Sequence, residues 1–248
     1  MTLSRPGIVL ALALAAAAPV SAQEPTPGRP IRLLLASTKL AAVTDEPLHF
    51  MLVRVTVPAG QSFAYAGPHG MIYPVVGGLS VTMAGERKSV QEGEAVYVAR
   101  GQRATLTAGQ GGPATFLHYL LAPPANLGGS FHARPASVTE LYRTPEGIPN
   151  LKPGPYEFTM TRVVAQPRSP APPMHHRSGA ALYYVLSGAW TIHLEDRTEP
   201  RGRGLVQYEP NGFIHTWENV GDTPGALLQA NISPEGAPEI IFLPRPAR

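Results

Sequence analysis

The sequence predicts an all-β protein that contains two copies of one fold. The composition has 28 Pro and 25 Gly but only 15% charged residues, which suits a turn-rich β chain better than a helical one. No long segment carries the 3.6-residue apolar period of an amphipathic helix. A set of turn and aromatic positions also recurs after 108 to 111 residues, and this recurrence fixes the number of copies at two.

The internal repeat spans a whole folding unit. The separation between matching positions changes by only three residues along it, from 108 to 111. We therefore expect one copy at residues 31–122 and the other at 155–248, with small loop insertions between them. The matching sets are Phe50, Arg54 and Val55 with Phe158, Arg162 and Val163; Tyr73, Val75 and Gly78 with Tyr183, Val185 and Gly188; and Gly93, Tyr97 and Gly101 with Gly204, Tyr208 and Gly212.

Residues 1–22 have the features of a signal peptide. Arg5 gives a positive start, and Ile8–Ala18 is an apolar run too short to span a bilayer comfortably. Val20-Ser21-Ala22 forms a small-residue cleavage site, although an uncleaved N-terminal anchor is the alternative. We expect a periplasmic or secreted protein with a flexible leader at 23–30. No later segment is apolar enough to cross a membrane, so we expect no membrane contact after cleavage.

The sequence contains no cysteine, which excludes disulfides, cysteine-based zinc sites and a thiol nucleophile. The 20 basic residues are scattered against 17 acidic ones. The nearest approach to a basic cluster is Arg197, Arg201 and Arg203 in one loop, which we interpret as solvated. Without a basic stripe interleaved with aromatic residues, we expect no nucleic acid partner.

In chain order, Ile31–Leu35 and Leu48–Val57 have the pattern of strands, and Pro58-Ala59-Gly60 ends the second. Residues 123–154 form a Pro- and Gly-rich linker between the copies, with one structured stretch at Ser137–Arg143. Each copy alone is too small to bury a hydrophobic core that would stabilise it well, so we expect the two copies to pack together.

Gly204–Asn219 predicts a strand, a tight turn and a second strand. Pro210-Asn211-Gly212 has turn chemistry, and the strand after it alternates. One face of that strand presents His215 between Phe213 and Trp217.

The same stretch matches the spacing G-x5-P-x-G-x2-H-x3-N at every position. This spacing resembles the second signature of the cupin superfamily, whose members are small jelly-roll β-barrels in which this histidine is a metal ligand. The resemblance implies two tandem cupin-type barrels joined by the linker (a bicupin). It also implies a possible homodimer, because cupins often pair through barrel faces.

The first cupin signature resembles H-x-H-x4-E, and this chain departs from it. Counting back from Gly188 places Ala181 at the glutamate, His176 at the second histidine and Met174 at the first. In the first copy, the four ligand positions fall on Ala64, Ala66, Met71 and Ala104. The resemblance therefore implies no metal in the first barrel, which we interpret as structural or as enclosing an apolar cavity.

Three outcomes remain open for the second barrel. Met174 and His176 share a strand face, whereas His175 points the other way unless a bulge re-aims it. The first outcome is that His176 and His215 bind no metal and hydrogen-bond a ligand or water. The second is that His175 or a substrate oxygen completes a weak site for one divalent ion (Fe, Mn, Zn, Ni or Cu). The third is a softer, copper-favouring set of Met174, His176 and His215.

An apolar cup should surround this site. Tyr183, Val185 and Trp217 share its inward parity, and we expect them to bind a small-molecule ligand together with Phe213 and Ala181. We interpret Glu195, Glu209 and Glu218 as polar rim positions and His193 as a surface or edge residue. His49, His69, His118 and His132 have no partner at ligand spacing.

The sequence names no catalytic residue. We expect an exported bicupin that binds a small organic ligand in its C-terminal barrel, in a sensor-like or non-catalytic role. The alternative is a metal-dependent cupin enzyme, oxygenase- or decarboxylase-like, that uses His176 and His215 as ligands.

Overall fold

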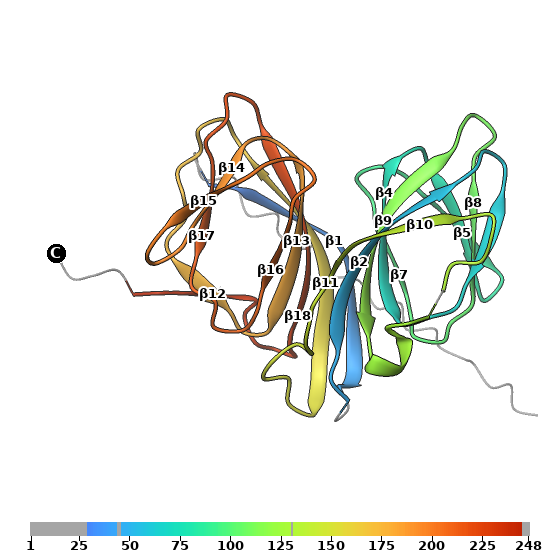
Figure 1. Ribbon diagram of the computed structural model, residues 1–248, viewed down its shortest axis with the longest axis horizontal. Coiled ribbons are helices and arrows are strands. Elements are labelled where there is room, and N and C mark those ends of the chain that lie inside the picture. The colour runs from blue at the N-terminus through green and yellow to red at the C-terminus, as the bar shows by residue number, and fades with distance from the viewer. Residues whose placement is uncertain (1–28, 44–45, 130, 245–248) are drawn as a thin grey trace, which may run out of the picture.

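The computed structural model describes residues 29–43, 46–129 and 131–244, which fold into two β-barrels side by side (Figure 1). The all-β prediction is confirmed, because the only helix among these residues is a short 3-10 turn, Pro124–Asn126. None of the described helices is long and apolar enough to cross a membrane. The predicted signal peptide and most of the predicted leader lie outside the described residues.

Each barrel is built from antiparallel strands arranged as facing sheets. In the first barrel, the sheet β10-β2-β9-β4-β7 faces the sheet β3-β8-β5-β6. Its strands are β2 (His49–Val57), β3 (Ser62–Tyr65), β4 (His69–Val76), β5 (Leu79–Met83), β6 (Glu86–Val90), β7 (Val96–Val98), β8 (Ala104–Ala108), β9 (Ala114–Ala122) and β10 (Ser137–Arg143).

The second barrel repeats this plan. The sheet β1-β11-β18-β13-β16 faces the smaller sheets β15-β14-β17 and β12-β19. Its strands are β1 (Ile31–Val43), β11 (Gly154–Ala165), β12 (His175–Arg177), β13 (Ala180–Ser187), β14 (Trp190–His193), β15 (Thr198–Arg201), β16 (Val206–Glu209), β17 (Thr216–Asn219), β18 (Gly225–Pro234) and β19 (Ile240–Phe242).

The two larger sheets pack against each other, as the size of each copy predicted. Strand β9 shows how one strand serves two cores, because its side chains alternate between faces. Phe116 and Leu120 lie in the core of the first barrel. Tyr119 and Leu121 belong to a core that also contains Phe158 from β11. The largest apolar core among the described residues therefore lies between the barrels.

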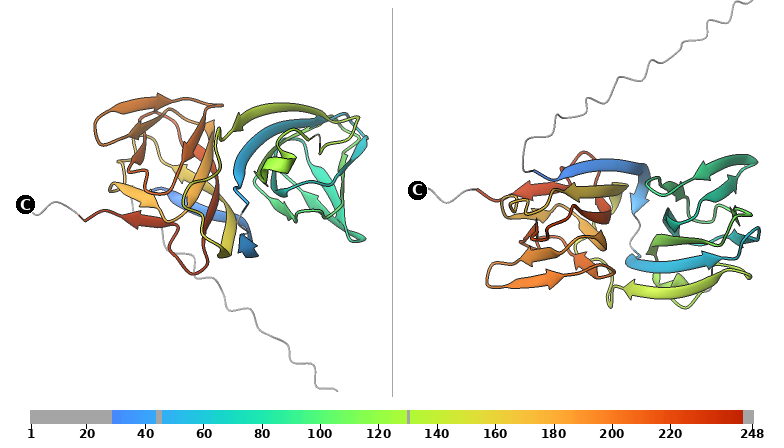
Figure 2. Two further views of the ribbon diagram at one scale, coloured as in Figure 1. Left: turned by 60° about the horizontal axis from the view of Figure 1, so that its bottom comes forward. Right: turned by 90° about the horizontal axis from the view of Figure 1, so that it is seen from above.

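Two strands lie elsewhere than the sequence predicted, one in the other barrel and one in a barrel instead of the linker. Strand β1 pairs with β11 of the second barrel, from Ile31 opposite Val164 to Val43 opposite Gly154, and lies along that barrel in Figures 1 and 2. Strand β10, predicted as part of the linker, pairs with β2 of the first barrel. The predicted boundaries at 31–122 and 123–154 thus differ from the strand pairing at these two places. The apolar pattern of a strand predicts that it will join a sheet but does not indicate which edge of which sheet.

The repeat is visible in the register of the strands. Tyr73 lies opposite Leu117 in the first barrel, and Tyr184 lies opposite Leu228 in the second, so equivalent positions differ by 111. The counterpart of Tyr73 is therefore Tyr184 rather than Tyr183, and the counterpart of Tyr183 is Ile72. This one-residue correction matters, because a shift by one moves a side chain to the other face of the sheet.

Candidate functional site

The histidine that faces His215 is His175. Their backbones form a reciprocal pair, with His175 N donating to His215 O at 3.0 Å and His215 N donating to His175 O at 2.9 Å. Directly opposed residues of an antiparallel pair project to the same face, and the two ring centroids are 4.6 Å apart. His176 and Met174 alternate with His175 and are only half-buried. The prediction that His176 and Met174 share a face with His215 is therefore wrong, because this register sets the opposite parity.

Both inward imidazoles are fixed in the same way. His175 Nδ1 donates to Pro173 O at 3.0 Å, and His215 Nδ1 donates to Phe213 O at 2.9 Å. Because a carbonyl only accepts, each Nδ1 carries a hydrogen. The Nε2 atom of each ring is then available for another partner.

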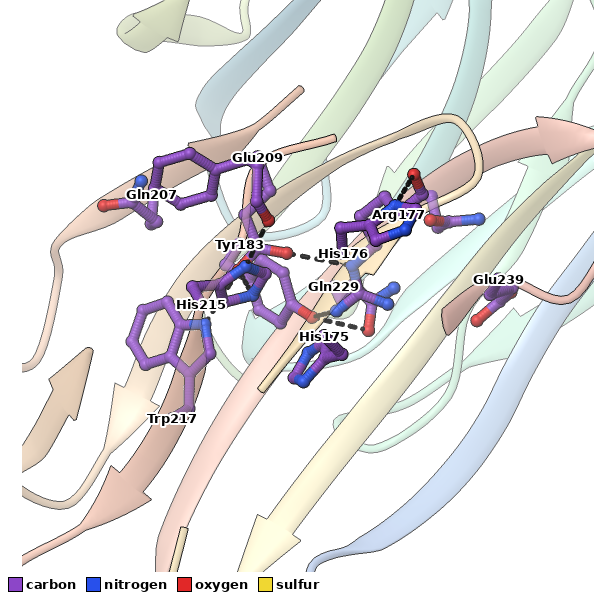
Figure 3. Close-up of polar contacts among 12 residues, drawn as sticks. His175, His176, Arg177, Tyr183, Gln207, Glu209, His215, Trp217, Gln229 and Glu239 are labelled. Carbon is purple, nitrogen blue, oxygen red and sulfur yellow. Dashed lines mark hydrogen bonds and ion pairs between the residues drawn. The ribbon is translucent and has the colours of Figure 1, made fainter. Parts of the chain in front are cut away.

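Glu209 lies at the centre of the site and is fully buried, so its predicted place on the rim is wrong (Figure 3). One carboxylate oxygen accepts from Arg177 Nε at 2.9 Å, and Arg177 is itself only 1% exposed. The other oxygen accepts from Trp217 Nε1 at 2.8 Å and lies 2.7 Å from His215 Nε2.

The charges around the site set its protonation. Burial alone would raise the pKa of Glu209, but the charges of His215 and Arg177 and the contacts with His215 and Trp217 lower this pKa to about 2. Burial and the neighbouring His215 lower the pKa of His175 to about 4. At neutral pH the site therefore contains a carboxylate, a guanidinium and an uncharged His175 imidazole.

A chain of hydrogen bonds extends from Arg177 across the barrel. The Tyr183 hydroxyl accepts from Arg177 Nη2 and donates to Gln229 Oε1 at 3.0 Å. Arg32 of β1 donates to the same amide oxygen at 2.8 Å. Within the part of the chain that the structure describes, Arg177 Nη1 and Gln229 Nε2 are buried donors without a hydrogen-bond acceptor.

The residues that we expected to bind a ligand lie together. Ala181, Tyr183, Val185 and Trp217 belong to one buried core inside the second barrel, and Phe213 packs against it. The Tyr183 and Trp217 rings are 5.5 Å apart. Sequence reasoning missed Arg177 and Glu209. The β13–β16 register, which puts Glu209 opposite the small Ala181, explains where the carboxylate finds room.

The first barrel has different contents. Ala64 and Ala66 are exposed, Met71 belongs to the core between the barrels and Ala104 is an apolar wall residue. Yet His118 and His132 are buried and hydrogen-bonded to each other, 2.9 Å between Nδ1 and Nε2. The two histidines are 14 residues apart in the sequence, a spacing that did not predict their contact. The contact joins β9 to the segment that follows it.

The donor atoms of the second barrel do not fit a three-ligand metal centre. No group of three or more His, Cys, Asp or Glu residues that could hold a metal ion occurs among the described residues. Glu209 is engaged by Arg177 and Trp217. The two imidazoles alone would hold a divalent ion weakly.

The comparisons with known proteins agree with this architecture. A sequence model of the cupin domain matches residues 161–230, a span that begins in β11 and ends in β18, and the paired barrels are those of solved two-barrel cupins. Residues 161–230 are therefore a cupin domain, and the chain as a whole has the fold of two-barrel cupins. No curated protein matches this chain by sequence.

Three solved structures illustrate the likeness, each at an identity that shows the fold alone. Oxalate decarboxylase from Bacillus subtilis at pH 4.6 is 16% identical with a TM-score of 0.55, over 91% of this chain and 81% of that one. AerE from Microcystis aeruginosa is 13% identical with a TM-score of 0.52, over 80% and 98%. Salicylate 1,2-dioxygenase from Pseudaminobacter salicylatoxidans is 9% identical with a TM-score of 0.52, over 75% and 71%.

Proposed function

We propose that this cupin is an exported, non-catalytic binding protein whose C-terminal barrel holds a small organic ligand that carries a hydrogen-bond acceptor, such as a carboxylate or an enol. The observation that carries the proposal is the pair of buried donors without acceptors, Arg177 Nη1 and Gln229 Nε2. A buried donor without a partner costs about 1–3 kcal/mol, and an acceptor group on a ligand removes this cost.

The surroundings support recognition rather than chemistry. The Tyr183 and Trp217 rings supply apolar contact, and the Arg177–Glu209 ion pair holds the donors in place. Glu209 is a poor general base at neutral pH, because its pKa is about 2 and proton transfer is most efficient when that value is near the working pH.

Gln229→Glu tests the proposal, because it removes the unpaired donor and keeps the oxygen that accepts from Tyr183 and Arg32. Calorimetric titration with a panel of small carboxylic acids and enols should give saturable binding to the mature protein. We expect at least tenfold weaker binding in this variant and no change in a surface control, Gln110→Glu. Equal affinity in Gln229→Glu and wild type would remove the basis of the proposal.

Export has its own test. Full-length protein made in a bacterial host should be recovered from the periplasm or medium with Gln23 as its first residue. Recovery from the cytoplasm with the N-terminal segment intact would contradict the proposed export.

A second candidate, a metal-dependent cupin enzyme, is favoured by one observation. The Nδ1 atoms of His175 and His215 both donate to carbonyls, which is how proteins usually orient metal-binding imidazoles. Another Bacillus subtilis oxalate decarboxylase structure is described as having Mn(II) centres. Metal analysis of protein purified from its own host decides between the two. A bound metal lost in His175→Ala and in His215→Ala but kept in His176→Ala would favour the enzyme, whereas metal-free protein would exclude it.

A further inference from the structure

A cleft of about 520 Å³ opens between the two barrels, away from the interior of either. Its lining comes in pairs that the repeat relates: Arg54 with Arg162 by their place in the β2 and β11 strands, and Tyr73 with Tyr184 and Val75 with Leu186 by their place in β4 and β13. The cleft therefore has an approximate two-fold symmetry, with one arginine contributed by each barrel.

The charge of this cleft is uneven. Glu92 of the first barrel and Arg203 of the second occupy equivalent lining positions, so three guanidinium groups face one carboxylate. In the neighbouring loop, Arg197 and Arg201 form ion pairs with Asp196 and Glu199. Over the described residues, no ion pair is made by Arg54, Arg162 or Arg203.

Each of the paired arginines reaches toward the other barrel. Arg54 Nη2 donates to the Tyr184 hydroxyl at 3.1 Å. On the opposite side, a Cβ on Gly93 of the first barrel would lie 4.0 Å from Arg162 Nη1. Arg162 Nε is buried and has no hydrogen-bond acceptor in the described part of the chain. The cleft thus presents guanidinium donors from both barrels. One of these donors, Arg162 Nε, has no hydrogen-bond acceptor among the described residues.

We propose that this cleft is a second ligand site, which binds a short organic dicarboxylate. One carboxylate would lie against Arg54 and the other against Arg162, because guanidinium groups bind carboxylates through paired, charge-assisted hydrogen bonds. The carbon spacer would lie on Val75 and Leu186, which also line the cleft. The volume falls within the range of about 300–1,000 Å³ that small-molecule sites occupy.

The proposed site is separate from the one inside the second barrel. Arg162 alternates with Thr161 and Val163 along β11, and those two side chains are buried on the other face of the strand. A ligand between the barrels therefore does not touch Arg177 or Glu209, and variants can perturb the two sites independently.

Calorimetric titration of the full mature protein at low ionic strength tests the inference, with malonate, succinate and glutarate as probes and acetate and inorganic phosphate as comparisons. We expect saturable binding of at least one dicarboxylate, at least tenfold tighter than acetate or phosphate. Arg54→Met and Arg162→Met should each weaken that binding by at least tenfold. Glu92→Gln should strengthen it several-fold, because it removes the only carboxylate among the charged lining residues.

Arg103→Met is the matched control, since this exposed arginine of the first barrel lies outside the cleft and its loss should leave affinity unchanged. Thermal unfolding of every variant checks that the interface between the barrels persists. Where Arg54 or Arg162 variants do not fold, Arg203→Met at an exposed position should still weaken binding several-fold. The inference is overturned if no dicarboxylate binds, if phosphate or acetate binds as tightly as the dicarboxylates, or if folded arginine variants keep wild-type affinity.

Discussion

The two barrels share one strand register and differ in what they enclose. Three inward positions of the first barrel are Val98, Ala104 and Leu106, all part of an apolar core. Their counterparts in the second barrel are Glu209, His215 and Trp217, which are hydrogen-bonded or ion-paired with one another. The same backbone therefore supports either an apolar filling or a polar network, and the choice is made by the side chains at a few inward positions.

Arg177 shows how the second barrel makes room for its polar network where the first barrel has an apolar filling. Its carbonyl accepts from Gly212 N in the second barrel, and the carbonyl of Gly67 accepts from Gly101 N in the same way in the first. The position of the buried arginine is thus taken in the first barrel by a glycine. The Phe131 ring lies against that glycine, where a Cβ would be 2.8 Å from it. A charged side chain in one barrel corresponds to an aromatic ring from a distant segment in the other.

The largest expected effect comes from breaking the polar network of the second barrel. Glu209→Gln leaves Arg177 buried without its counter-charge, which should destabilise the protein by about 3–5 kcal/mol. Denaturant unfolding measures the loss. Glu218→Gln is the control, because this half-exposed carboxylate pairs with His193 and its loss should cost under about 1 kcal/mol. If the two variants lost similar amounts of unfolding free energy, burial of the Arg177–Glu209 pair would not contribute to stability.

The double variant Arg177→Met with Glu209→Leu sharpens the comparison, since it gives the second barrel an apolar filling like that of the first. It should recover a good part of the stability lost in Glu209→Gln, because apolar residues of similar volume often replace buried ion pairs without loss. A double variant less stable than Glu209→Gln would show that the two barrels cannot exchange fillings.

A smaller effect is expected from Gly70→Ala in the first barrel. A Cβ at Gly70 would lie 2.2 Å from His118 Nε2, whereas the counterpart in the second barrel is already an alanine, Ala181. Overpacking of this kind costs about 1–3 kcal/mol, measurable by thermal unfolding. His118→Ala in the same chain should offset part of that cost by making room for the methyl group. Unchanged stability of Gly70→Ala would contradict the close approach.

A pH dependence should arise from the buried histidines of both barrels, since the pKa of His175 in the second barrel is also lowered to about 4. Burial lowers the pKa of His132 to about 4, below its value of about 6.5 in an unfolded chain. Between these values the unfolded state binds the proton and the folded state does not, so stability falls as the pH falls from about 6.5 to 4. The pKa of Glu209 is also lowered, to about 2, and its contribution is lost only at more acidic pH, below about 4.5.

His132→Gln should therefore flatten the dependence of unfolding free energy on pH by about 3 kcal/mol between pH 6.5 and 4. It should leave the loss at more acidic pH unchanged. A variant whose stability falls as steeply as that of wild type in the first window would show that His132 is not the titrating group.

The sequence predicted the fold well, because turn glycines and the repeat are local signals. The positive φ of Gly188 and Gly204, both 88°, and of Gly212, 77°, belongs to turns that the sequence pattern identified. The pairing of β1 with the second barrel and of β10 with the first could not be predicted in this way, because strand pairing depends on which sheet edge is free.

The site was predicted in part. His215, Tyr183 and Trp217 were placed on the inward face correctly, because each strand alternates and one residue fixes its parity. Arg177 was missed, and His175 was expected to point away from the site unless a bulge re-aimed it. The motif spacing assigned parity from Met174 and His176, and only the opposing strand reveals the true register. Glu209 was missed because a carboxylate beside a turn usually lies on the surface.

The pairing of β1 with the second barrel has a consequence for how the chain folds during synthesis. During synthesis, β1 leaves the ribosome before the whole first barrel, yet its hydrogen-bonding partner β11 follows that barrel. The strand must wait with an exposed edge while residues 49–143 fold beside it. If the gene were divided after β10, β1 would stay with the N-terminal half, so the C-terminal half would lack the edge strand of its barrel.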